Sequence, residues 1–143
     1  MTTTKRPTKK ELHEKWYLLN AQGYPLGRLA SRVARLLIGK EGEIFDPAVL
    51  HPVKVIVINA AAVKVTGKKM TQKIYYRHSG YMGGLKSTRL EELMAKKPTM
   101  AVIKAVSGML PKNRLRKLRL ANLKVYPGTD HPHIAQKPVN LEL

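Results

Sequence analysis

The residues with the clearest chemistry in this chain are the Lys and Arg side chains of one short segment, 112–119. Five of its eight residues are cations, and two of the others are leucines. If the segment is helical, the leucines pack down while most of the cations project outward. A solvated basic helix is the plain alternative. Exposed like charges destabilise each other unless phosphates or counterions neutralise them, so the pattern favours binding to a polyanion.

A second candidate segment, 68–86, combines cations with tyrosines and glycines. Glycines let a backbone approach a ligand closely, and exposed N–H groups can donate to phosphate. Aromatic rings and Arg planes stack on unpaired bases, which RNA offers far more often than DNA. At least one of Tyr75 and Tyr76 should point into the core, because neighbours on a strand face opposite ways. This segment indicates contact with RNA.

A third set of cations lies on a helix predicted from Leu26 to Ile38 and ended by Gly39. Its apolar residues recur every three or four positions and form one stripe, while three arginines form another. Solvated helix surface is an equally simple explanation for such a stripe alone, and the overall charge shifts the interpretation toward phosphate contact. The full set of predicted RNA-binding residues is Arg28, Arg32, Arg35, Lys40, Lys68, Lys69, Lys73, Tyr75, Arg77, His78, Tyr81, Lys86, Lys112, Arg114, Arg116, Lys117 and Arg119.

The charge balance of the chain supports the same interpretation. Of 143 residues, 27 are Lys or Arg and 9 are Asp or Glu, which gives a net charge of +18. Between residues 47 and 129 there are seventeen cations and only two carboxylates, Glu91 and Glu92. A helix predicted here accounts for both, with Thr88 as N-cap, Glu91 completing a capping box, and Pro98 as the stop. The unopposed charge predicts a nucleic-acid partner.

Several kinds of chemistry lack their motifs. The chain contains no cysteine, no Gly-x-x-x-x-Gly-Lys-Ser/Thr and no Gly-x-Gly-x-x-Gly. His131 and His133 flank a proline, and we expect a surface loop there rather than a metal site. No general acid/base pair stands out. We therefore expect no enzyme activity, no metal, no cofactor and no small-molecule substrate. The alternatives left open are an RNA-modifying or RNA-cleaving enzyme, a DNA-compacting protein and, more weakly, a membrane-surface binder.

The elements that must position these residues alternate between strand and helix, which predicts an α/β fold around a partly parallel sheet. A β-branched run at 53–59 is typical of a strand covered on both faces. The other predicted elements are strands at 16–20, 73–77 and 123–126 and helices at 99–109 and within 113–122.

We expect a single domain at 16–126, preceded by a basic arm, 1–15, and followed by an extended tail, 127–143, that contains three prolines. The apolar share of 43% is enough for a folded core. No apolar run approaches the length needed to span a bilayer, and the N-terminus lacks a signal core, so we expect a cytoplasmic protein.

Six segments in order resemble the bacterial large-subunit ribosomal protein thirteen family. These segments are 16–17 with 26–31, 57–60, 65–69, 75–80 with 83–84, 105–113 and 131–136. The resemblance implies a three-layer α/β/α fold around a four-stranded, mainly parallel sheet. It also implies a structural role on 23S ribosomal RNA beside neighbouring large-subunit proteins, with a part in early assembly of the 50S subunit. Two features depart from the family: Arg116 stands where a glycine is usual, and the N-terminal arm is longer and more basic.

Overall fold

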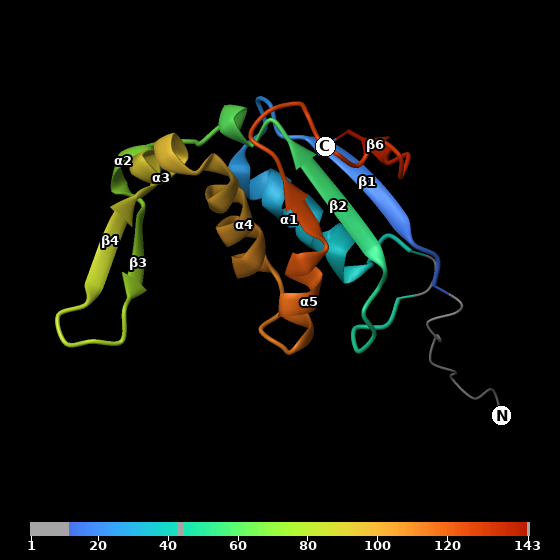
Figure 1. Cartoon of the computed structure of the whole chain (residues 1–143), viewed down its shortest axis with the longest axis horizontal. Coiled ribbons are helices and arrows are strands. Elements are labelled where there is room, and N and C mark those ends of the chain that lie inside the picture. The colour runs from blue at the N-terminus through green and yellow to red at the C-terminus, as the bar shows by residue number, and fades with distance from the viewer. Residues whose placement is uncertain (1–11, 43–44, 143) are drawn as a thin grey trace.

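The fold is built on a four-stranded sheet in which every strand pairing is parallel (Figure 1). The computed structural model describes residues 12–42 and 45–142, so most of the predicted arm, 1–15, lies outside the described residues. The strand order is β5-β2-β1-β6. The strands are β1 (Lys15–Asn20), β2 (Val53–Ile58), β5 (Leu123–Val125) and β6 (Val139–Leu141). The predicted α/β class and four-stranded parallel sheet are confirmed.

One face of this sheet carries the main core, which forms against helices α1 (Leu26–Ile38) and α4 (Pro98–Met109). The bounds of α1 match the prediction because its apolar stripe is buried and its end is sharp. Gly39 takes a left-handed backbone, with φ at 90°, and its N–H bonds back to the last turn. Helix α5 (Leu115–Ala121) follows α4 and leads into β5. Buried apolar side chains thus fix α1, the helix that carries one of the three predicted cation sets.

The opposite face of the sheet is covered by the segment that joins β5 to β6, so the third layer is not helical. Ile56 on this face is fully buried. The Trp16 ring lies against His133, with ring centroids 5.1 Å apart. The segment predicted as an extended tail, 127–143, thus packs on the sheet and supplies its edge strand, β6. A strand of three residues is too short to be recognised from the sequence, because only pairing with β1 defines it.

A two-stranded antiparallel ribbon stands away from this body, as Figure 1 shows at the end opposite β6. It is formed by β3 (Ile74–His78) and β4 (Leu85–Arg89), with α2 (Lys69–Gln72) and α3 (Leu90–Lys96) at its base. A 3-10 turn, η1 (Ala60–Ala62), lies between β2 and α2.

The ribbon corrects two details of the sequence prediction. Thr88 is not the N-cap of a helix: it lies in β4 opposite Tyr75, and α3 starts two residues later without a side-chain cap. Pro98 does not simply stop a helix, because it is the first residue of α4, where its missing N–H costs nothing. Glu91 and Glu92 do lie in the first turn of α3, as predicted.

Candidate nucleic-acid interface

The ribbon presents the most exposed of the predicted side chains. Arg77 lies directly opposite Lys86, and His78 lies opposite Leu85. All four side chains are exposed, and the ribbon strands contain no carboxylate. Like charges placed opposite each other on a ribbon are destabilising. An arrangement with that cost is explained most simply by a negatively charged partner.

The tip of the ribbon is apolar, whereas its strands are basic. Tyr81 is 80% exposed and Met82 is fully exposed. Two glycines beside them, Gly80 and Gly83, have positive φ values of 93° and 69°, which only glycine adopts without strain. The loop therefore holds one aromatic and one thioether side chain out in solvent. An exposed aromatic ring such as that of Tyr81 can stack on an unpaired base.

Tyr75 and Tyr76 point to opposite faces of the ribbon, as expected. Tyr76 is exposed, whereas Tyr75 is half-buried at the base, and burial raises the pKa of its hydroxyl. The ammonium groups of Lys104 and Lys73 lie 4.6 and 5.6 Å from the Tyr75 ring centroid. Lys68 and Lys69 are exposed nearby in sequence, at the start of α2.

Helix α5 divides the basic segment 112–119 into exposed and buried residues. Lys112, Arg114 and Lys117 are exposed, and Arg116 is half-buried. Arg119 is 1% exposed, and its Nη2 donates to the Pro47 carbonyl over 3.1 Å. Arg119, a member of the predicted RNA-binding set, is therefore not accessible to RNA in this structure.

The orientation of α5 explains why Arg119 is buried. Leu118, which was expected to pack down, is 50% exposed, so the helix is rotated relative to the predicted packing. Burial lowers the pKa of Arg119, although a guanidinium remains charged at neutral pH. Its Nε has no hydrogen-bond partner in the structure. The buried guanidinium of Arg119 thus connects α5 to the loop after α1 through its hydrogen bond to the Pro47 carbonyl.

The arginine stripe on α1 is accessible in part. Arg28 and Arg35 are exposed, and so is Lys40 just beyond the helix. Arg32 is half-buried and forms an ion pair with Glu41, with Nη1 and Oε1 2.6 Å apart. These arginines and Ser31 line a shallow hollow on the surface of α1. Arg32 is already neutralised within the chain, so the other arginines are better placed to meet phosphate.

Two further lysines lie at the base of the ribbon, and the sequence alone did not single them out. Lys64, after η1, and Lys104, on α4, are both exposed and line a cleft with Lys69, Lys73 and Tyr75. Lys104 is a lone cation on an otherwise apolar helix, a signal that the sequence held. Lys64 offered no such signal, because only the fold brings it beside the ribbon.

The acids of the described chain are mostly engaged locally. The Glu14 carboxylate accepts bonds from Lys54 over 2.6 Å and from the Trp16 indole over 2.8 Å. The bond from Lys54 is the main reason that the pKa of Glu14 lies below its ordinary value. Asp46 accepts from the Ala48 N–H. These acids stabilise local structure and are not on the ribbon.

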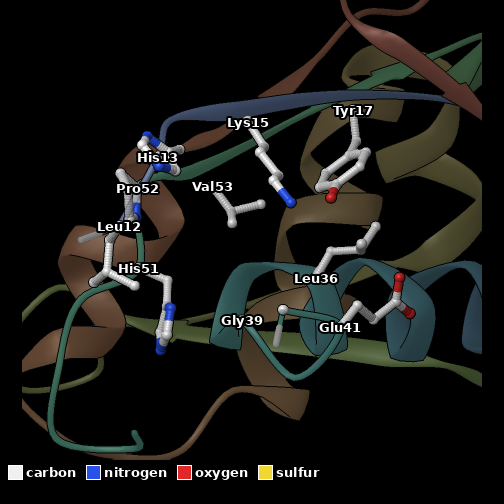
Figure 2. Close-up of a pocket in the computed structure, with 11 residues that line it drawn as sticks. Leu12, His13, Lys15, Tyr17, Leu36, Gly39, Glu41, His51, Pro52 and Val53 are labelled. Carbon is white, nitrogen blue, oxygen red and sulfur yellow. The ribbon is translucent and has the colours of Figure 1, made fainter. Parts of the chain in front are cut away.

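A separate pocket of about 250 Å³ lies between β1, the end of α1 and the start of β2 (Figure 2). His51 lies in its wall and is 4% exposed. A side chain at Gly39 would overlap the His51 ring, so this close contact requires glycine. Figure 2 shows Lys15 and Glu41 on different sides of the hollow, and both are exposed. Close packing between Gly39 and His51 is a sufficient explanation for the buried histidine.

The described residues 12–42 and 45–142 contain no group of three or more His, Asp or Glu that could hold a metal. His131 and His133 are half-buried against the Tyr126 and Trp16 rings rather than free in a loop. No helix in this part of the chain is both long and apolar enough to span a membrane.

Fold and surface together define a basic α/β protein with an acid-poor face of the kind that associates with polyanions. The chain belongs to the ribosomal protein L13 family, whose model matches residues 14–132.

Individual relatives are similar over nearly their whole length. The large ribosomal subunit protein uL13 of Nitratidesulfovibrio vulgaris is 50% identical over 137 residues, which cover 96% of this chain and 95% of that protein. The protein of the same name from Symbiobacterium thermophilum is 48% identical over all 143 residues, covering both chains fully. That from Natranaerobius thermophilus is 51% identical over 138 residues, 96% of each. The predicted family is confirmed.

Proposed function

We propose that this protein is a non-catalytic, structural constituent of the large ribosomal subunit in the cytoplasm. In this proposal it binds 23S ribosomal RNA, contacts neighbouring large-subunit proteins and takes part in early assembly of the 50S subunit. Membership of the ribosomal protein L13 family and the names of its relatives support this role.

The single observation that carries the proposal is the ribbon. It extends from the body, pairs Arg77 with Lys86 across its strands, and ends in an exposed Tyr81 and Met82. A protein that needed only to stay soluble would gain nothing from opposed cations and an uncovered apolar tip. Folded RNA supplies phosphates for the cations and unpaired bases for the tip.

The mechanism is stoichiometric binding rather than turnover. Lys and Arg side chains replace counterions around the RNA, and the released counterions contribute a large share of the binding free energy. The packed sheet and helices hold the ribbon, α1 and α5 in fixed relative positions. The protein would therefore stabilise one arrangement of RNA segments, which is a useful property early in assembly.

Sedimentation of a lysate that contains tagged protein tests the role directly. The protein should comigrate with large subunits and be released at high salt. Depletion of the protein from cells should cause precursors of the large subunit to accumulate. Protein found only at the top of the gradient, at low salt as well as at high salt, would contradict the proposal.

The RNA preference can be tested with purified protein. Binding to 23S rRNA should weaken steeply as salt rises, and duplex DNA at equal phosphate concentration should compete poorly. Equal competition by DNA would instead favour a DNA-compacting protein.

A further inference from the structure

A candidate ligand site outside the ribbon tip is a cleft at the base of the ribbon. Its volume is about 520 Å³, within the range of sites that hold small ligands. The start of α1, the segment after η1, β3 and the end of α4 form its walls. The lining residues are Pro25, Leu26, Gly27, Lys64, Val65, Thr66, Lys69, Lys73, Tyr75, Leu90, Lys104, Ala105, Gly108 and Met109.

The cleft combines an apolar wall with a cationic rim. Four lysines line it, all four are exposed, and the lining contains no carboxylate. Met109, at the end of α4, leaves an apolar side chain 44% exposed at the cleft. An apolar wall with unopposed cations fits a planar, uncharged group that is attached to an anion.

Lys104 is already positioned for an anion at the rim. Its ammonium lies 4.6 Å from the Tyr75 ring centroid, at the distance of a cation–π contact. Such a contact restricts the flexible side chain, so less entropy is lost when a phosphate binds.

The cleft is continuous with the basic face of the ribbon. Tyr75 and Arg77 are two residues apart on β3 and therefore share a face, and Lys86 lies opposite Arg77 on that face. A single polyanionic strand can follow these cations from the ribbon into the cleft. This continuity favours RNA over a protein partner.

We propose that this cleft holds one unstacked nucleotide of the bound RNA, with its base against the apolar wall and its flanking phosphates at the four lysines. The proposal rests on the proposed function and adds a specific site to it. The site would fix the position of an RNA bulge or loop relative to the ribbon.

Two glycines allow the cleft to be filled without loss of charge. An added Cβ at Gly27 or Gly108 meets no atom within 4 Å, and neither residue has a positive φ. Both lie in helices, where leucine is a better helix former than glycine. Gly27→Leu and Gly108→Leu should therefore fold and occupy the cleft from two sides. Ala95→Leu, at an exposed position on α3 outside the cleft, is the matched control.

The experiment measures binding of full-length protein to transcribed 23S rRNA at several salt concentrations. We expect each glycine variant to bind about ten- to a hundredfold more weakly, the loss typical of one unstacked base. Its salt dependence should be unchanged because no cation is lost. Lys104→Gln should weaken binding and reduce the salt slope by about 1. Ala95→Leu should match the parent protein.

The outcomes separate the two proposals. If the parent protein fails to bind, or binds without salt dependence, the proposed function itself fails. If the parent binds with a steep salt dependence but both glycine variants match it, the nucleotide site alone is overturned.

Two competitors identify the occupant. Ultraviolet crosslinking of rRNA to Tyr75 should be blocked by a single-stranded oligonucleotide. Adenosine monophosphate at the same phosphate concentration should block the crosslink poorly. Polyglutamate at the same concentration of carboxylates should also block it poorly. Equal blocking by the mononucleotide would assign the cleft to a free nucleotide, and equal blocking by polyglutamate would assign it to an acidic protein, so either result overturns the proposal.

Discussion

The Trp16 ring on β1 lies against the His133 ring, 117 positions later in the chain, with centroids 5.1 Å apart and planes tilted by 39°. His133 Nε2 is also hydrogen-bonded to the Tyr126 hydroxyl, 3.0 Å away. The ammonium of Lys54 lies 4.6 Å from the Trp16 ring centroid. These contacts hold the segment between β5 and β6 against the sheet, and they place the only tryptophan where it reports on that contact.

His133→Ala should destabilise the protein by about 1–2 kcal/mol, because it removes one hydrogen bond and one aromatic contact. Urea unfolding followed by Trp16 fluorescence measures the change. The neighbouring Ile134 is 76% exposed, so Ile134→Ala should change stability by less than about 0.5 kcal/mol. Equal effects of the two substitutions would mean that the ring contact contributes little.

Glu14 should make the stability depend on pH in the acid range. Its folded-state pKa lies below the ordinary value of 4.5, chiefly because Lys54 donates to its carboxylate. A lowered pKa adds stability above pH 4.5, and this stability is lost as the pH falls through the folded-state value. The difference in unfolding free energy between parent and Glu14→Gln should therefore be larger at pH 6 than at pH 3.

The Lys54→Met background is the control for that measurement. Without the ammonium, Glu14 loses the main cause of its lowered pKa, so the pH-dependent difference should shrink strongly. A difference that persisted in this background would point to another cause.

Arg119 and Arg114 lie on the same basic segment and should behave oppositely. Arg119→Ala leaves the Pro47 carbonyl without its donor and opens a cavity, so we expect a loss of about 2–4 kcal/mol of stability. Arg114 is exposed, and Arg114→Ala should leave stability nearly unchanged while reducing the salt slope of RNA binding by about 1. Urea unfolding and filter binding on both variants give the comparison. If Arg119→Ala greatly lowered the affinity for RNA but kept the stability of the parent protein, the structural role of Arg119 would be contradicted.

The parts of the fold that the sequence predicted well depend on local patterns. Helix α1 was predicted with its observed bounds because its period and its terminal Gly39 are both encoded within a few residues. Strand β2 was equally clear, since a strand covered on both faces has a continuous β-branched run.

The errors arise where a distant partner decides the structure. Thr88 has a reasonable capping sequence, but pairing with β3 places it in a strand. The segment 139–141 becomes a strand only because β1 offers an open edge. Arg119 belongs to a run of exposed cations by composition, and only the packing of α5 against the loop at Pro47 buries it. The sequence therefore predicted that the candidate surface is basic, but it did not predict which individual cations are exposed on it.

The opposed pair Arg77 and Lys86 gives the sharpest test of why the ribbon is basic. Lys86→Glu places a carboxylate opposite Arg77, so the cross-strand repulsion becomes an attraction. The ribbon should become more stable by about 0.2–1 kcal/mol. Binding to 23S rRNA should nevertheless weaken, because one phosphate contact is lost and a negative charge meets the backbone.

Lys97→Glu makes the same change in net charge at the junction between α3 and α4, outside the predicted set. It should lower RNA affinity less than Lys86→Glu does, and it should leave the stability of the ribbon unchanged. Hydrogen exchange of the β3 and β4 amides measures ribbon stability, and filter binding at fixed salt measures affinity. Opposite shifts in the two measurements for Lys86→Glu alone would mean that the chain accepts a less stable ribbon because the ribbon binds RNA. Parallel losses in both measurements would mean that Lys86 supports the ribbon itself, and the charge argument for this surface would fail.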